Sequence, residues 1–183
     1  KVIALDAESG KPRWEANVRG EVLAAPVVAG DRVVVRLVDG RLRALNAADG
    51  KEAWMVEDIV PRLTLRGTAP PVAAGDVVIS GFDSGRVMAV TLASGEILWQ
   101  AQVASPRGRT ELERLADVDA AVRVAGQEVF AVGYQGRIAI LAVPLRPTAI
   151  AVVDDRRLGA VRRRPRRLSE AMTEVEVLAV HLV

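Results

Sequence analysis

A repeating unit that ends in tryptophan is the feature that most constrains the fold of this chain. The three tryptophans, Trp14, Trp54 and Trp99, are spaced by 40 and 45 residues. Each closes a similar stretch, "ALDAESGKPRW", "ALNAADGKEAW" or "AVTLASGEILW", in which alanine, glycine and tryptophan keep the same spacing. Periods of this length with several short strands are typical of β-propeller blades. The repeat therefore predicts an all-β fold built of blades.

The second unit shows the strands that one blade would contain. "PVVAGDRVVV" is a strand, a Gly-Asp turn and a strand, and "VDGR" is a second tight turn in which Gly40 suits a positive φ. "RLRALN" and "EAWMV" read as two further strands around the "AADGK" turn. Four strands joined by hairpins form one antiparallel sheet, and such a sheet buries both faces by stacking on its neighbours. We therefore expect four-stranded antiparallel blades.

The repeated tryptophans have two interpretations. Trp14, Trp54 and Trp99 can act as structural wedges between adjacent blades, where a buried indole removes much apolar area from water. Repeats of this style also resemble those of quinoprotein dehydrogenases, which stack a quinone cofactor on a tryptophan beside a vicinal cysteine pair. The chain has no cysteine. The wedge interpretation is therefore favoured, and no cofactor is expected.

The composition offers little catalytic chemistry. Half of the 183 residues are apolar, and the net charge of +2 makes no electrostatic case for nucleic acid. The one histidine, His181, has no evident serine or cysteine partner. Asp117 and Asp119 of "DVD" have no histidine or third acid nearby in the sequence, which is weak support for a metal site. A protein that is not an enzyme and binds no metal is expected.

A charged, glycine-free stretch, "RTELERLADVDA" (109–120), separates two expected strands. It is either a solvated connection or an interaction site. It and the surrounding residues 105–140, together with "PRLTLRGTAPPVAAGDVVISGFDSGRVMAV" (61–90), resemble the BamB family, propeller lipoproteins of the outer-membrane β-barrel assembly machinery. The resemblance covers residues 1–141, or roughly three and a half of the family's eight blades.

The resemblance implies a non-catalytic adaptor in the periplasm, at the inner face of the outer membrane. Its partner would be the barrel-forming subunit, through that subunit's periplasmic POTRA domains. The lipid anchor would lie outside this chain, which begins within an expected strand and without an initiator methionine, so we expect the true N-terminus to be missing. Two alternatives remain, a fragment of a quinoprotein-like dehydrogenase and a propeller module with another partner.

The residues that the family uses for its partner map onto two stretches. The Leu-x-Leu-Arg motif falls on Leu63, Leu65 and Arg66, and the Asp-x-Asp motif on Asp117 and Asp119. The leucines would be apolar anchors, and the fork-shaped guanidinium of Arg66 suits a carboxylate or backbone carbonyls. The acids would orient Arg66 or meet a basic group of the partner. In the alternative interpretation, the leucines alternate on a buried strand and the acids are solvated.

The repeat breaks down after residue 141. Gly40 and Gly85 precede their tryptophans by fourteen residues, so Gly136 predicts a tryptophan at position 150, where the chain has Ile150. The turn glycine is replaced by Arg146. We therefore expect a partial propeller over 1–143 and an arginine-rich, non-blade tail over 144–183.

The tail is expected to be non-native to the fold or out of frame. If Val152 and Val153 are encoded by GTG-GTG, reading one base later gives Trp-Trp close to the expected position. "VRRRPRRL" (161–168) could suggest nucleic-acid binding, which is not favoured here, and "LSEAMTEVEVLAVHL" (168–182) could form a helix capped by Ser169.

Overall fold

The computed structural model describes residues 1–65, 67–134, 137–142 and 151–153, which form short strands joined by turns and loops. The strands are β1 (Val2–Leu5), β2 (Pro12–Ala16), β3 (Val27–Ala29), β4 (Arg32–Arg36), β5 (Arg41–Asn46), β6 (Glu52–Glu57), β7 (Val72–Ala74), β8 (Val77–Gly81), β9 (Arg86–Thr91), β10 (Ile97–Gln102), β11 (Arg123–Ala125), β12 (Glu128–Gly133), β13 (Arg137–Ala142) and β14 (Ala151–Val153). In this part of the chain, no helix has the length and apolar character needed to span a membrane.

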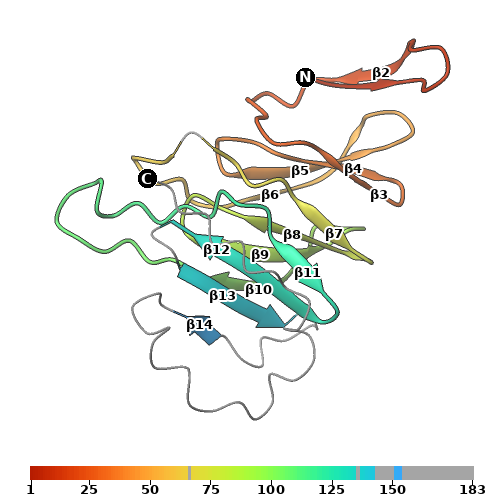
Figure 1. Cartoon of the computed structure of the whole chain (residues 1–183). Coiled ribbons are helices and arrows are strands. Elements are labelled where there is room, and N and C mark those ends of the chain that lie inside the picture. The colour runs from red at the N-terminus through yellow and green to blue at the C-terminus, as the bar shows by residue number, and fades with distance from the viewer. Residues whose placement is uncertain (66, 135–136, 143–150, 154–183) are drawn as a thin grey trace.

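The strands form successive antiparallel sheets in chain order (Figure 1). β1 and β2 make a two-stranded sheet, and each of the following sets, β3–β6, β7–β10 and β11–β14, makes a four-stranded one. Neighbouring strands within each sheet pair antiparallel, and within the β3–β6 and β7–β10 sheets short turns connect them. The prediction of an all-β partial propeller with four-stranded antiparallel blades is confirmed.

The strand register reproduces the sequence repeat. In three sheets the alanine of the repeat lies opposite its tryptophan: Ala4 opposite Trp14, Ala44 opposite Trp54, and Ala89 opposite Trp99. The pairing shifts register close to each of these pairs. A shift in the same place indicates that each "SG" or "DG" turn demands the same local geometry.

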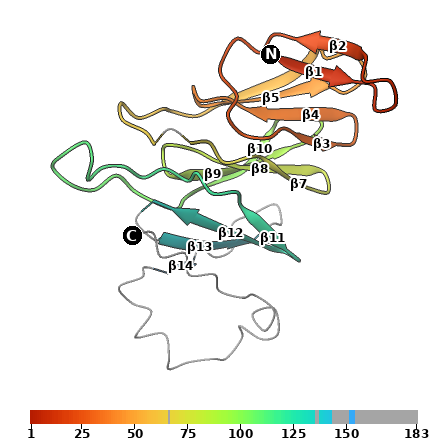
Figure 2. The ribbon, with the colours of Figure 1, turned by 45° about the horizontal axis from the view of Figure 1, so that its top comes forward.

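The core lies between the sheets (Figure 2). One buried apolar cluster joins β1–β2 to the β3–β6 sheet, a second joins β3–β6 to β7–β10, and a third joins β7–β10 to β11–β14. Strands such as β4 and β9 are almost wholly buried, as expected for sheets covered on both faces. Each sheet therefore depends on its neighbours for stability.

Trp14 and Trp54 bridge consecutive sheets, whereas the indole N–H of Trp99 has no acceptor within the described residues. The indole N–H of Trp54 in β6 donates to the Leu92 carbonyl of the next sheet at 2.8 Å, and Trp14 makes the same bond to Ala47 at 2.8 Å. A Cβ on Gly95 would lie 2.7 Å from the Trp54 ring, and one on Gly50 would lie 2.5 Å from the Trp14 ring. These contacts support the wedge role that the repeat predicts, and they explain why the turn glycine accompanies the tryptophan.

The fourth sheet departs from this pattern. Ile140 of β13 occupies the repeat position of Ala44 and Ala89, and it lies opposite Ala151 of β14, where the earlier sheets have a tryptophan. β14 falls within the range 144–183 that the sequence assigns to a non-blade tail, so this part of the tail does pair as a strand. The rest of that range lies outside the described residues, and the boundary at residue 143 stays a prediction.

The β1–β2 sheet exposes apolar side chains, which predicts self-association. Ile3 is 51% exposed and Leu5 is 57% exposed. Exposed apolar strands of this kind promote association. We expect the chain to form oligomers in light scattering, and the double variant Ile3→Lys, Leu5→Lys to shift it toward monomer. Glu8→Lys, which adds positive charge to an exposed position of the same hairpin, is the control. A monomeric wild type at high concentration would contradict the prediction.

Candidate functional site

The charged stretch 109–120 begins with a capped turn. The Glu113 carboxylate accepts the backbone N–H groups of Arg109 at 2.7 Å and Thr110 at 3.1 Å, and the Glu113 N–H donates to the Thr110 hydroxyl at 3.2 Å. This reciprocal pattern is a capping box. The two backbone N–H groups lower the pKa of Glu113. The exposed half of the stretch is therefore locally ordered by its own side chains.

The second half of the stretch, residues 115–118, is buried between two sheets. The Val118 N–H donates to the Phe82 carbonyl at 3.2 Å, and the Asp117 carbonyl accepts the Tyr134 N–H at 2.7 Å. Phe82 follows β8 and Tyr134 follows β12, so the loop is attached to a sheet on each side. A solvated connection does not describe this half, because its backbone fixes the positions of the two aspartates.

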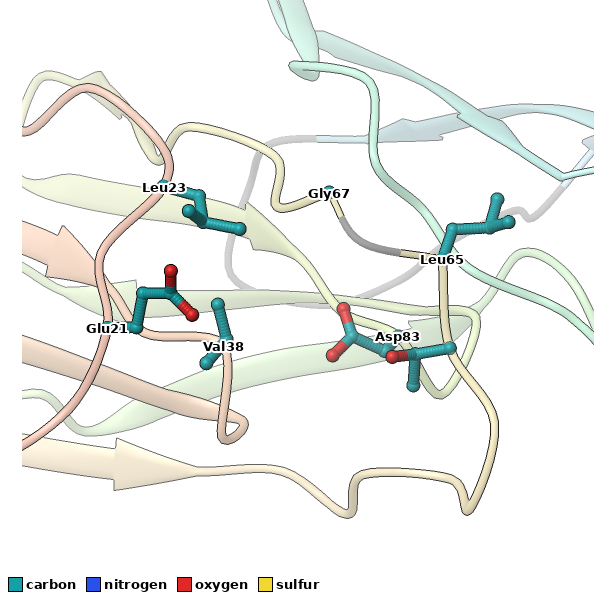
Figure 3. Close-up of a pocket in the computed structure, with 7 residues that line it drawn as sticks. Glu21, Leu23, Val38, Leu65, Gly67 and Asp83 are labelled. Atoms are coloured by element: carbon teal, nitrogen blue, oxygen red, sulfur yellow. The ribbon is translucent and has the colours of Figure 1, made fainter.

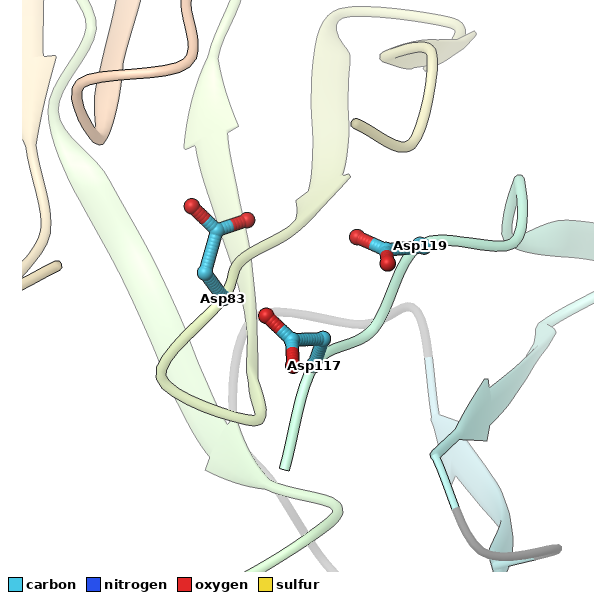
Figure 4. Close-up of side chains that lie close together, drawn as sticks. All are labelled: Asp83, Asp117 and Asp119. Carbon is cyan, nitrogen blue, oxygen red and sulfur yellow. The ribbon is translucent and has the colours of Figure 1, made fainter. Parts of the chain in front are cut away.

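Asp117 and Asp119 lie beside a third acid, Asp83, in the turn between β8 and β9 (Figure 4). One carboxylate oxygen from each of the three lies within 4.8 Å of the others. Asp83 is 4% exposed and Asp117 is 1% exposed. The fold thus brings together three acids that are separate in the sequence.

A buried arginine from the preceding sheet reaches the same place. Arg36, the last residue of β4, is fully buried and stacks over the Phe82 ring at 4.5 Å from its centroid. Its guanidinium donates to the Gly81 carbonyl at 3.4 Å and to the Leu37 carbonyl, and it lies 3.4 Å from the Asp83 carboxylate. Arg36 therefore links the β3–β6 sheet to the edge of the acidic cluster.

Burial makes these carboxyl groups hard to ionise. Desolvation raises the pKa of Asp83 to about 6, against the opposing effect of Arg36. Desolvation, reinforced by the negative charges of Asp117 and Asp83, raises the pKa of Asp119 to about 6. Desolvation also raises the pKa of Asp117, although the backbone N–H groups of Asp117 and Leu65 act to lower it.

The raised pKa of Asp119 predicts a pH-dependent stability. Its folded-state pKa of about 6 is above the unfolded value of about 3.9, so the folded chain binds this proton more tightly. The stabilisation is complete below about pH 4 and is lost as pH rises through about 6. In urea melts without divalent cations, the stability of the wild type relative to Asp119→Asn should fall across this window. A difference that stays constant with pH would contradict the prediction.

The two leucines predicted to meet a partner are on the surface. Leu63 is 43% exposed and Leu65 is 37% exposed, in the loop between β6 and β7. They do not alternate on a buried strand, and Asp117 is not solvated, so the alternative interpretation of these residues is wrong. Arg66 lies outside the described residues.

The loop that carries the leucines approaches the acidic cluster. A Cβ on Gly67 would lie 3.2 Å from an Asp119 carboxylate oxygen. The Leu65 N–H is close enough to the Asp117 carboxylate to lower its pKa, although the two groups do not form a hydrogen bond. A neighbouring open pocket of about 260 Å³ joins Leu65 to Asp83 (Figure 3). Its lining residues are Glu21, Leu23, Val38, Thr64, Leu65, Gly67 and Asp83.

Two residues of the site escaped the sequence analysis, although the repeat contains a signal for them. Arg36 and Asp83 stand four and two residues before the turn glycines Gly40 and Gly85. The equivalent positions of the other copy are Gly81 and Val38, which carry no charge. A charge at such a position marks a place where one blade differs from the next. Arg32 and Arg43 differ from Val77 and Met88 in the same way, so this signal alone does not single out the cluster.

Comparison with known proteins identifies the family. A family model described as "Outer membrane protein assembly factor BamB" matches residues 1–165. The chain belongs to the BamB family. The BamB protein of Bordetella pertussis is 43% identical over 138 residues, which make up 75% of this chain and 36% of that protein. The chain spans about a third of the length of the curated BamB relatives it matches.

Solved structures give the same result. The crystal structure of BamB from Moraxella catarrhalis superposes with a TM-score of 0.76 at 28% identity, covering 83% of this chain and 46% of that one. The quinohemoprotein alcohol dehydrogenase ADHIIG from Pseudomonas putida HK5 matches with a TM-score of 0.56 at 19% identity, covering 72% of this chain and 20% of that one, a likeness of fold alone. The BamB relatives are named as assembly factors, in agreement with the prediction that the chain is not an enzyme.

Proposed function

We propose that this chain belongs to a non-catalytic adaptor of the outer-membrane β-barrel assembly machinery. The adaptor acts at the periplasmic face of the outer membrane and binds the periplasmic POTRA domains of the barrel-forming subunit. Its relatives are named as outer membrane protein assembly factors. The observation that carries the proposal is that Leu65 and Gly67 approach the distant stretch 117–119 at one end of neighbouring sheets.

The residues of this surface have different roles in the proposal. Leu63 and Leu65 are exposed enough to lose apolar area to a partner, as anchors at the centre of an interface do. Asp117 is almost wholly buried, and its backbone carbonyl, which accepts the Tyr134 N–H, helps to hold the loop in place. Asp119 is only partly buried and is the acid placed to meet a basic group or Arg66. In the proposal the guanidinium of Arg66 donates hydrogen bonds to the partner. This role is assigned from the position of Arg66 in the Leu-x-Leu-Arg motif.

Alanine substitution of the two leucines tests the proposal. Leu63→Ala and Leu65→Ala should each weaken binding of the full 183-residue chain to immobilised POTRA domains by roughly tenfold, because each truncates an apolar anchor. Val28→Ala is the control, since Val28 is 68% exposed on β3 and belongs to neither the 63–67 segment nor the stretch 109–120. The leucine variants should stay folded, because exposed substitutions usually change stability by about 0.5 kcal/mol or less.

The possible outcomes distinguish an error in the proposed binding surface from an error in the proposed partner. If the wild type binds POTRA domains and both leucine variants bind equally well, the proposed surface is wrong. If the folded wild type binds no POTRA domain but captures another envelope protein, the adaptor has a different partner.

A further inference from the structure

The acidic cluster differs from an ordinary group of surface acids because its members are buried and incompletely paired. Within the described residues, neither carboxylate oxygen of Asp117 has a hydrogen-bond donor, and one oxygen of Asp119 also lacks one. Asp117 is 1% exposed and its carboxylate points toward Asp83 (Figure 4). A buried acceptor without a donor costs free energy, and the cost is larger when the group is charged. A positively charged ligand close to these oxygens would therefore stabilise the ionised carboxylates.

The positive charges that the structure places nearby do not balance the cluster. Asp83, Asp117 and Asp119 carry three negative charges when ionised, and Arg36, 3.4 Å from Asp83, supplies one positive charge. The neighbouring Asp58 has a cation of its own, because Arg86 lies 2.9 Å from it. Counting only the part of the chain that the structure describes, two negative charges remain, which is the charge that one divalent cation neutralises.

The ligand set is that of a hard cation. All three side chains offer carboxylate oxygens, which Ca²⁺ and Mg²⁺ prefer, and neither imidazole nor thiolate ligands belong to the cluster. The positions of the ligands are fixed in advance by the backbone. The Val118 N–H donates to the Phe82 carbonyl, and the Tyr134 N–H donates to the Asp117 carbonyl, so both ligand-bearing segments are held before any cation binds.

We propose that Asp83, Asp117 and Asp119 form a binding site for one divalent cation, most simply Ca²⁺, which joins the β8–β9 turn to the β10–β11 loop. The ion would tie the β7–β10 sheet to the loop leading into the β11–β14 sheet, directly beneath Leu65. The site goes beyond the proposed adaptor function, and its test needs no partner protein. In the sequence, "DVD" has only two acids, and the fold supplies the third from an adjacent blade.

The site is tested with the full 183-residue chain, stripped of metal with EDTA and dialysed. Calorimetric titration with CaCl₂ and, separately, MgCl₂ should show one ion per chain for at least one of them. The thermal unfolding temperature should rise with that cation, because an ion that binds only the folded state stabilises it. Asp117→Asn, which keeps the side-chain shape but removes the charge, should weaken binding by roughly tenfold or more.

Two further variants keep the result decisive. Asp76→Asn removes an exposed acid from the β7–β8 turn of the same sheet and should bind the cation like wild type. Asp119→Asn replaces Asp117→Asn if the latter does not fold. Without cation, Asp117→Asn should be at least as stable as wild type, since it removes a buried unpaired charge.

The opposite results would overturn the proposal. Folded wild type that shows neither binding nor a shift in unfolding temperature with about 5 mM Ca²⁺ or Mg²⁺ has no such site. Equal cation binding by wild type, Asp117→Asn and Asp119→Asn would place any bound ion elsewhere.

Discussion

Replacing Trp54 with alanine is expected to unfold the chain or remove its cooperative transition. Trp54 is 8% exposed, packs in the cluster between the β3–β6 and β7–β10 sheets, and donates its indole N–H to Leu92. Truncating a buried aromatic of this size costs about 3–5 kcal/mol, a large fraction of the stability of an ordinary domain. Trp14→Ala should cost visibly less, because Trp14 is only partly buried and belongs to the two-stranded sheet.

Urea melts followed by circular dichroism measure both losses. Trp54→Phe is the matched control, since it keeps an aromatic ring but removes the bond to Leu92, and it should fall between wild type and Trp54→Ala. Small and equal losses for Trp54→Ala and Trp14→Ala would show that the tryptophans are not the wedges between blades.

Reversing the charge of Arg66 is the second large effect we expect, this time on binding. In the proposal Arg66 acts beside the partly exposed Asp119, so a glutamate at position 66 would meet a like charge on its own chain. It would also present the wrong sign to whatever carboxylate or carbonyl the arginine meets on the partner. Unfavourable contacts of this kind cost several kcal/mol, so affinity for the POTRA domains should fall by about a hundredfold or more.

The acids provide the companion test of this prediction. Asp119→Ala should also weaken binding, because Asp119 is the partly exposed member of the cluster. Asp117→Ala should weaken it less than Asp119→Ala, since Asp117 is buried and acts only through its neighbour Asp119. If both variants bind like wild type while remaining folded, the stretch 109–120 has no part in binding.

The blades were predictable from sequence because their determinants are local. The glycine turns, the alternation of apolar residues and the fixed distance from alanine to tryptophan all act within about fifteen residues, so the antiparallel register opposite Ala44 and Ala89 follows from the repeat. The pairing of Ala151 with Ile140 was not predictable in this way, since the tail lacks both the turn glycine and the tryptophan.

The acidic cluster was only half predictable because its determinants are not local. Asp83 meets Asp117 only when the β10–β11 loop crosses the β8–β9 turn, a contact between segments more than thirty residues apart. Asp117 is buried while the nearby Leu65 is exposed, and this difference likewise depends on how the sheets stack. "ADVD" (116–119) alternates apolar and acidic residues, a pattern that does not say which residues face inward until the neighbouring sheets are in place.

Isothermal titration of POTRA domains into wild type and Arg66→Glu tests the central claim most directly. The account predicts a binding heat for the wild type, and for Arg66→Glu a heat that is lost or shifted to about a hundredfold weaker affinity, with both proteins giving the same circular dichroism spectrum. A folded Arg66→Glu chain that binds the POTRA domains as tightly as wild type would contradict it.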